Sequence, residues 1–280
     1  MTQAHNLARV MAIVNRTPDS FYDKGATFEL DPAIQRAEQA LDDGASIIDI
    51  GGVKAGPGEH VDAAEEIERV VPTIAELHCR RPEALISVDT WRAEVAEAAI
   101  AAGAGLVNDT WAGWDPELIE VAGHHKVGYV CSHTGGVTPR TRPHRVHFDD
   151  VVADVITETT RLAERAADLG CPEELTFIDP THDFGKNTFH GLELLRRIEE
   201  SVATGWPVLM ALSNKDFVGE TLDRAVDQRV AGTLAATAWS AARGVAAFRV
   251  HEVAPTLDVI RMTAAIQGQM APLATTRGLA

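Results

Sequence analysis

Eight short runs of apolar residues recur along the chain, and each is followed by a loop rich in Gly, Pro, Asn or Asp and then by a segment with helical periodicity. The runs are continuous rather than alternating, which is typical of parallel strands that are covered on both faces. We predict strands at residues 9–14, 46–50, 84–88, 105–108, 127–132, 175–179, 207–211 and 246–250.

Two of the intervening segments carry clear signals for the start and end of a helix. Residues 31–44 (DPAIQRAEQALDDG) begin with an Asp that we expect to be the N-cap, have Pro in the first turn, and end in Gly. Residues 90–103 (TWRAEVAEAAIAAG) begin with a Thr that we expect to be the N-cap and carry a Glu in the capping-box position.

Eight alternating β and α units in 280 residues predict an α/β fold of the (β/α)₈ TIM barrel type, which we expect to occupy residues 1–280 as a single domain. A doubly wound open sheet is the alternative, although no G-x-G-x-x-G follows the first strand. A long irregular segment at residues 132–148 follows the fifth strand. We expect it to form a mobile loop over the site.

Composition and charge narrow the classes of function. The formal net charge is −16 and the hydrophobic fraction is 45%, so the chain can fill a core but would repel nucleic acid and anionic membranes. The N-terminus lacks the features of a signal peptide and no run of about 18 uncharged apolar residues occurs, which predicts a cytoplasmic protein. The widely spaced Cys79, Cys131 and Cys171 predict reduced thiols rather than disulfides or a zinc site.

Polar residues gather where the predicted strands end. Each group alone is compatible with turn or cap chemistry, but the active site of a (β/α)₈ barrel lies at these ends, and buried polar groups are costly unless they bind something. The segments are NRTPDSF (15–21), SVDT (87–90), VNDT (107–110), IDPTHDFGK (178–186), ALSNKDF (211–217) and FRVHEV (248–253).

The side chains at these ends suit a fused, nitrogen-rich ring. Carboxylate and amide groups pair with ring N–H and amino groups, a role that we predict for Asp89, Asn108 and Asp179. A guanidinium can stack on such a ring and an ammonium can bond a ring nitrogen or carbonyl, which are the roles predicted for Arg249 and Lys215.

Two further residues suit an anion. Asn15 can act through a Mg²⁺ ion, and His251 can bind the anion directly. His133, His144 and His147 lie in the long loop, and we expect them to be scattered and exposed to solvent rather than zinc ligands.

As an ordered series, these motifs and the segment IIDIGG resemble the dihydropteroate synthase family over nearly the whole chain. The resemblance implies a homodimeric (β/α)₈ barrel that joins p-aminobenzoate to the methylene group of 7,8-dihydropterin pyrophosphate, with Mg²⁺ assisting the departure of pyrophosphate. The implied site comprises Asp89, Asn108, Asp179, Lys215 and Arg249 for the pterin, Asn15 and His251 for pyrophosphate, Asn15 for the metal, and Ser213 and Phe217 for the aminobenzoate subsite.

The second loop departs from the family pattern. Where the family reads Gly-Gly-Glu-Ser-Thr-Arg-Pro-Gly, this chain reads GGVKAGPG, so Ala55 and Gly56 replace the threonine and the arginine. Lys54 is the candidate to replace the lost cation, although an ammonium lacks the planar fork of a guanidinium. Arg16 follows Asn15 on a strand and should face away from the site, because neighbouring side chains on a strand point to opposite sides.

The sixth and seventh loops depart as well. His182 and Asp183 replace small or apolar residues, and Asn214 replaces an arginine. Asp216 adds a negative charge beside the implied aminobenzoate subsite.

We therefore predict a dihydropteroate synthase homologue of the folate pathway that keeps a pterin pocket but has little or no synthase activity. One alternative is an active synthase in which the changes are tolerated. A further alternative is a pterin-binding methyltransferase-like barrel.

Overall fold

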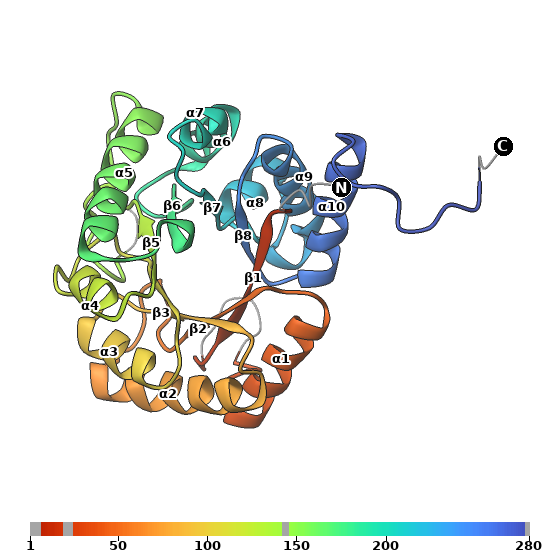
Figure 1. The fold of residues 1–280 in the computed structure, drawn as a ribbon. Helices are drawn as coiled ribbons and strands as arrows, with labels where there is room; N and C mark the ends of the chain where they lie inside the picture. The colour runs from red at the N-terminus through yellow and green to blue at the C-terminus, as the bar shows by residue number, and fades with distance from the viewer. Residues whose placement is uncertain (1–6, 19–24, 142–145, 278–280) are drawn as a thin grey trace.

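The computed structural model describes residues 7–18, 25–141 and 146–277, and the strands among them form a barrel surrounded by helices (Figure 1). All eight strands predicted from the apolar runs are confirmed. They are β1 (Arg9–Asn15), β2 (Ile47–Gly51), β3 (Leu85–Asp89), β4 (Leu106–Asp109), β5 (Gly128–Ser132), β6 (Thr176–Asp179), β7 (Leu209–Met210) and β8 (Ala247–Val250).

The strands are parallel and follow one another around the barrel in chain order, with β8 beside β1. The ladder runs from β6 through β1 and β8 to β7. A parallel bridge between Ile178 and Val208, with the Ile178 N–H 2.9 Å from the Pro207 carbonyl oxygen, joins β6 to the residues just before β7. The fold is therefore the predicted (β/α)₈ barrel, and the doubly wound open sheet is wrong.

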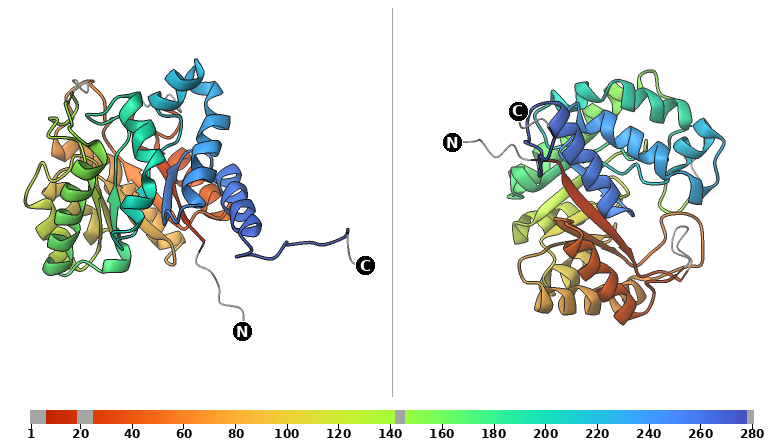
Figure 2. Two further views of the ribbon diagram at one scale, coloured as in Figure 1. Left: turned by 90° about the horizontal axis from the view of Figure 1, so that it is seen from above. Right: turned by 90° about the vertical axis from the view of Figure 1, so that its right-hand side faces the viewer.

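Helices cover the outer surface of the barrel in both views of Figure 2. Two helices follow β6 and two follow β7, so some units carry more than one helix. They are α1 (Leu30–Asp42), α2 (Ala63–Arg80), α3 (Ala93–Ala101), α4 (Leu118–His125), α5 (Val151–Leu169), α6 (Thr188–Arg196), α7 (Ile198–Val202), α8 (Asp216–Leu222), α9 (Val230–Ala241) and α10 (Val253–Ile266).

Both predicted N-caps are wrong. Helix α1 begins at Leu30, so Asp31 lies inside the first turn. The first N–H groups of a helix have no partner within it, so Pro is tolerated anywhere in the first turn. The position of the Pro therefore does not identify the first residue of the helix. Helix α3 begins at Ala93 without a side-chain cap. Thr90 instead accepts the Arg92 N–H at 3.2 Å, which makes a turn before the helix.

The inside of the barrel has an apolar floor. Side chains alternate between the two faces of a strand, so residues two positions apart on a strand face the same way. One cluster takes a residue from every strand: Met11, Ile47, Leu106, Val130, Phe177, Leu209 and Ala247, with Leu85 packed against them. Two positions further along the strands, the same inward face carries polar residues such as Asp49, Asn108 and Arg249.

The chain after α10 leaves the barrel as an extended segment (Figures 1 and 2). Residues 271–277 of this segment are exposed. Among the described helices, none combines the length and apolar character needed to cross a bilayer.

Candidate functional site

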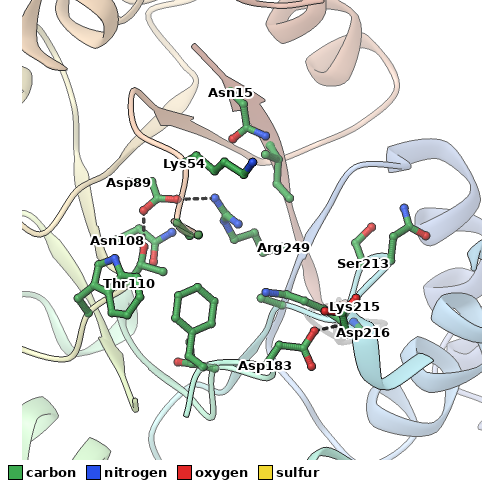
Figure 3. Close-up of a pocket in the computed structure, with 18 of the residues that line it drawn as sticks. Asn15, Lys54, Asp89, Asn108, Thr110, Asp183, Ser213, Lys215, Asp216 and Arg249 are labelled. Atoms are coloured by element: carbon green, nitrogen blue, oxygen red, sulfur yellow. Dashed lines mark hydrogen bonds and ion pairs between the residues drawn. The ribbon is translucent and has the colours of Figure 1, made fainter. Parts of the chain in front are cut away.

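A cavity of about 370 Å³ lies at the carboxyl ends of the strands. Figure 3 shows side chains from several strands and loops pointing into it. Of the nine residues singled out from the sequence, eight line this cavity: Asn15, Asp89, Asn108, Asp179, Ser213, Lys215, Arg249 and His251.

Below the cavity, Arg249 is held by two carboxylates. Its Nε donates to Asp49 Oδ2 at 2.6 Å and its Nη2 donates to Asp89 Oδ2, also at 2.6 Å. Asp49 is fully buried and accepts further hydrogen bonds from Ser87 Oγ at 2.6 Å and Asn108 Nδ2 at 3.1 Å. Burial lowers the pKa of Arg249, but the two carboxylates outweigh it, so the pKa is raised and the guanidinium keeps its charge.

Asp49 was assigned no role from the sequence, although it lies two residues before Gly51 on the same inward face of β2. The position of Asp49 in the sequence could have indicated a role. A carboxylate within the apolar run IIDIG is costly to bury without a partner. Its partner is the side chain of Arg249, 200 residues further along the chain, which only the closed barrel brings close.

Asp89 and Asp179 present carboxylates from the ends of two different strands, β3 and β6. Asp89 also accepts a hydrogen bond from the hydroxyl of Thr110, and burial raises its pKa while Arg249 opposes this. Asp179 Oδ1 accepts the Thr181 N–H at 2.7 Å, and burial raises its pKa to about 6 despite that bond and the charge of Lys215.

Two aromatic rings that sequence reasoning missed form part of the wall. The ring centroids of Trp111 and Phe184 are 5.0 Å apart, and Lys215 Nζ lies 4.9 Å from the centroid of Phe184. Asp109 is buried and accepts the Trp111 N–H at 3.0 Å, which places that indole at the cavity. Aromatic rings at this position supply a surface on which a flat ligand can stack.

The loop after β2 forms the roof of the cavity through residues 53–57. Lys54 extends over Arg249 toward Asn15 (Figure 3). Arg140, from the long loop after β5, donates to the Glu59 carbonyl at 2.5 Å and so joins the two loops. Arg16 faces away as predicted, since its Nε donates to the Arg69 carbonyl at 3.1 Å and it does not line the cavity.

The long loop lies beside the site, where Val137 and Thr141 line the cavity. Its mobility stays a prediction. Of its histidines, His147 is exposed as expected, and His144 lies outside the described residues. His133 is not solvent-exposed: its Nε2 lies 2.6 Å from Asp154 Oδ1, and burial lowers its pKa to about 4.

Lys186 holds the loops under the cavity together. Its buried Nζ donates to the carbonyl oxygens of His133 at 2.7 Å, Phe184 at 3.1 Å and Thr181 at 3.3 Å. Burial lowers the pKa of Lys186 to about 7. Because its donors are directed at the backbone, Lys186 supports the position of Phe184 rather than reaching a ligand.

Phe217 does not line this cavity, although the aminobenzoate subsite was expected to include it. Phe217 is the second residue of α8 and is buried. Its ring packs against that of His182, with the ring centroids 5.2 Å apart. The side chain points into the core because α8 turns its apolar face inward. We therefore leave Phe217 out of the candidate site.

The described residues contain no group of three or more His, Cys, Asp or Glu side chains placed to hold a metal ion. Asn15, which was expected to contact Mg²⁺, lines the cavity with one amide side chain. Mg²⁺ commonly takes one or two protein oxygens and completes its shell with water and phosphate oxygens. The donor set therefore fits a metal ion only in company with a phosphorylated ligand.

Fold and site together define a (β/α)₈ barrel with a cavity edged by carboxylates, an amide, an arginine and aromatic rings. The family of pterin binding enzymes matches residues 11–251. The chain belongs to this family.

Individual relatives agree with that assignment. The chain is 59% identical to inactive dihydropteroate synthase 2 of Mycobacterium tuberculosis, over 99% of this chain and 88% of that protein. It is 37% identical to dihydropteroate synthase of Bacillus subtilis, over 90% and 86% of the two chains. The structure of Xanthomonas albilineans dihydropteroate synthase with 4-aminobenzoic acid superposes with a TM-score of 0.84 at 38% identity, covering 94% of each chain.

Replacing Asp179 by Asn is expected to raise the free energy of unfolding of the ligand-free protein by about 1–2 kcal/mol near pH 8. The pKa of Asp179 is about 6 in the folded protein against an ordinary value of 3.8, so its charge costs stability as the pH rises between these values. The gain should be small near pH 4, grow toward pH 6 and then stay constant.

Urea unfolding at a series of pH values measures this difference. Asp168→Asn, on the exposed surface of α5, removes the same charge and should leave the pH dependence unchanged. An Asp179→Asn protein less stable than the parent near pH 8 would show that the carboxylate is stabilised where it lies.

Proposed function

We propose that this protein binds a pterin in the cavity at the carboxyl ends of the strands and has little or no dihydropteroate synthase activity. The observation that carries the proposal is the convergence of five side chains on one cavity from five different loops and strands. They are Asp89, Asn108, Asp179, Lys215 and Arg249.

The chemistry of these groups matches a pterin. The ring carries an amino group, ring N–H groups and a carbonyl along one edge, and it needs acceptors and donors that lie in its plane. Asp179 supplies an acceptor and Lys215 a donor, while Asn108 supplies both. Asp49 and Asp89 hold the planar guanidinium of Arg249 in place beside the ring. The side chain therefore loses little conformational entropy when a ligand binds.

Loss of the synthase reaction follows from the roof of the cavity. Ala55 and Gly56 line it and present neither a hydroxyl nor a cation. Removing one well-placed charge-stabilising donor from a reacting anion costs roughly 3–4 kcal/mol, and glycine adds backbone freedom that closure of the loop must remove. The naming of the Mycobacterium tuberculosis relative as an inactive synthase supports this interpretation.

A Mg²⁺ ion would enter with a ligand that carries phosphate. Asn15 would contact it, and Lys54 and His251 would add positive charge or hydrogen bonds near the phosphate. The cytoplasmic location stays a prediction from the sequence.

Pterin binding is tested by isothermal titration with 6-hydroxymethylpterin. The parent is expected to bind, and Asp179→Asn should bind about 10–100-fold more weakly, because a charge-assisted hydrogen bond contributes about 1.5–3 kcal/mol. Asp168→Asn should bind as the parent does. Absence of binding by the parent at millimolar ligand would refute the proposed function.

The turnover experiment supplies dihydropterin pyrophosphate, p-aminobenzoate and Mg²⁺ to the purified protein. We expect negligible formation of dihydropteroate and no rescue of a strain that lacks its own synthase. Restoring the second loop by Val53→Glu, Lys54→Ser, Ala55→Thr and Gly56→Arg should raise the rate measurably. If the unmodified protein supports growth of that strain without folate end products, Lys54 or another group already supplies the missing charge and the protein is an active synthase.

We also propose that the protein is a homodimer, formed through the outer helices of the later units. An apolar groove of about 410 Å³ lies among α6, α8 and α9 and includes Phe217 and Val218. Leu222 and Trp239 border it with 46% and 45% of their surfaces exposed, which is unusual for side chains of this size. A second copy of the chain would cover this surface.

Light scattering after size-exclusion chromatography measures the assembly. Leu222→Asp should convert a dimer to a monomer, because a buried carboxylate without a partner opposes association. Leu169→Asp, at the end of α5 and 38% exposed, is the matched control and should remain dimeric. A monomeric parent at micromolar concentration would exclude this assembly.

A further inference from the structure

The outer end of the cavity, between the loops after β6 and β7, carries two carboxylates of the chain itself. Asp183 and Asp216 both line the cavity, and Figure 3 shows them next to each other beside Lys215. Asp183 Oδ2 accepts the backbone N–H of Asp216 at 2.6 Å. The backbone donor at the start of α8 is thus already occupied by an anion that belongs to the protein.

The backbone of the β6 loop is shaped to hold that carboxylate. Asp183 has a φ of 69°, in the left-handed region that residues other than glycine rarely adopt. Thr181, two residues earlier, shares this conformation with a φ of 52°. Strained residues of this kind persist where the surrounding structure fixes them, and they gather at ligand sites.

The cations at this end are also engaged by the chain. Arg229 Nη1 donates to Asp216 Oδ1 at 2.8 Å and to the Asn214 carbonyl at 2.9 Å, and its Nε donates to the Arg224 carbonyl at 3.2 Å. The helix leaves room for it at Gly219, where a Cβ atom would lie 2.4 Å from the guanidinium. Lys215 lies between Asp183 and Asp179, and both carboxylates act on its charge.

We propose that Asp183 and Asp216 set the ligand specificity of this end of the cavity. It rejects an anionic group on a bound pterin and accepts an uncharged or cationic hydrogen-bond donor, such as an amide or an amine. A ligand carboxylate placed here meets the carboxylates of Asp183 and Asp216, which already engage Lys215 and Arg229, and must displace Asp183 to reach the Asp216 N–H. An amide or amine instead donates to the carboxylates. Like charges brought together at a binding site discriminate strongly against the wrong ligand.

This inference rests on the proposed pterin site and identifies the ligands that it takes. It also gives a second, separate reason for the absence of synthase activity. p-Aminobenzoate is a carboxylate, and the sequence resemblance places its subsite beside Asp216, where the chain's own carboxylates already engage Arg229 and Lys215.

Isothermal titration near pH 8 with three compounds tests the inference. They are 6-hydroxymethylpterin, pteroate, which carries the carboxylate, and pteroic carboxamide, which has the same shape without the charge. The parent is expected to bind the carboxamide at least tenfold more tightly than pteroate. Asp183→Asn with Asp216→Asn should bring the two affinities within about threefold.

The variants keep the local conformation, because Asn tolerates the left-handed region as Asp does. Asp223→Asn is the matched control: Asp223 also has a left-handed φ, of 53°, and directly follows α8, but it does not line the cavity. It should leave the preference for the carboxamide unchanged. Each single variant should give an intermediate preference.

The outcomes separate the two proposals. The specificity inference is overturned, and the pterin site stands, if the parent binds 6-hydroxymethylpterin but prefers pteroate to the carboxamide or binds these two equally. The same holds if the double variant keeps the parent's preference. If none of the three compounds binds, the proposed pterin site is refuted and the inference with it.

Discussion

The ion pairs of Arg249 with Asp49 and Asp89 are the interaction on which the site depends. Asp49 is fully buried, and a buried carboxylate costs several kcal/mol unless a well-placed cation and hydrogen bonds compensate it. Its partners Ser87, Asn108 and Arg249 come from three other strands, so compensation requires the barrel to be closed in register. The same bonds fix the guanidinium and one carboxylate at the base of the cavity, which couples the folding of the barrel to the preparation of the site.

Above that base, the strand ends and the loops contribute different side chains to the cavity. Four polar residues at the strand ends, Asp89, Asn108, Asp179 and Arg249, line one cavity. In the loops, Ala55 and Gly56 offer neither a hydroxyl nor a cation, and Asp183 and Asp216 place carboxylates at the outer end. Loops tolerate substitution because few core contacts depend on them, so the chemistry of the loops can change while the barrel persists. The sixth loop is nevertheless held firmly by Lys186, which ties three backbone carbonyls together.

The sequence predicted the fold well because each strand and helix of a barrel has a clear pattern of apolar residues over a few positions. A parallel strand covered on both faces must be apolar along its length, and eight such runs alternating with helical segments have few other solutions. The polar residues at the strand ends were found for the same reason, since a buried strand that finishes in Asp, Asn or Arg marks the end at which the site lies. Local signals were weaker at helix starts, where Asp31 and Thr90 did not cap, because several first-turn positions accept the same residue types.

What the sequence by itself determined is therefore the set of strands, their order and most of the cavity-lining residues, together with the changed chemistry of the second loop. Only the tertiary structure decided which side chains meet: that Asp49 pairs with Arg249, that His133 is buried against Asp154, and that Phe217 belongs to the core. It also decided that Asp183 occupies the backbone donor at the start of α8. The physical reason is the distance along the chain over which each kind of interaction acts. Periodicity and turn chemistry act over a few residues, whereas the partner of a buried charge is chosen by closure of the whole barrel.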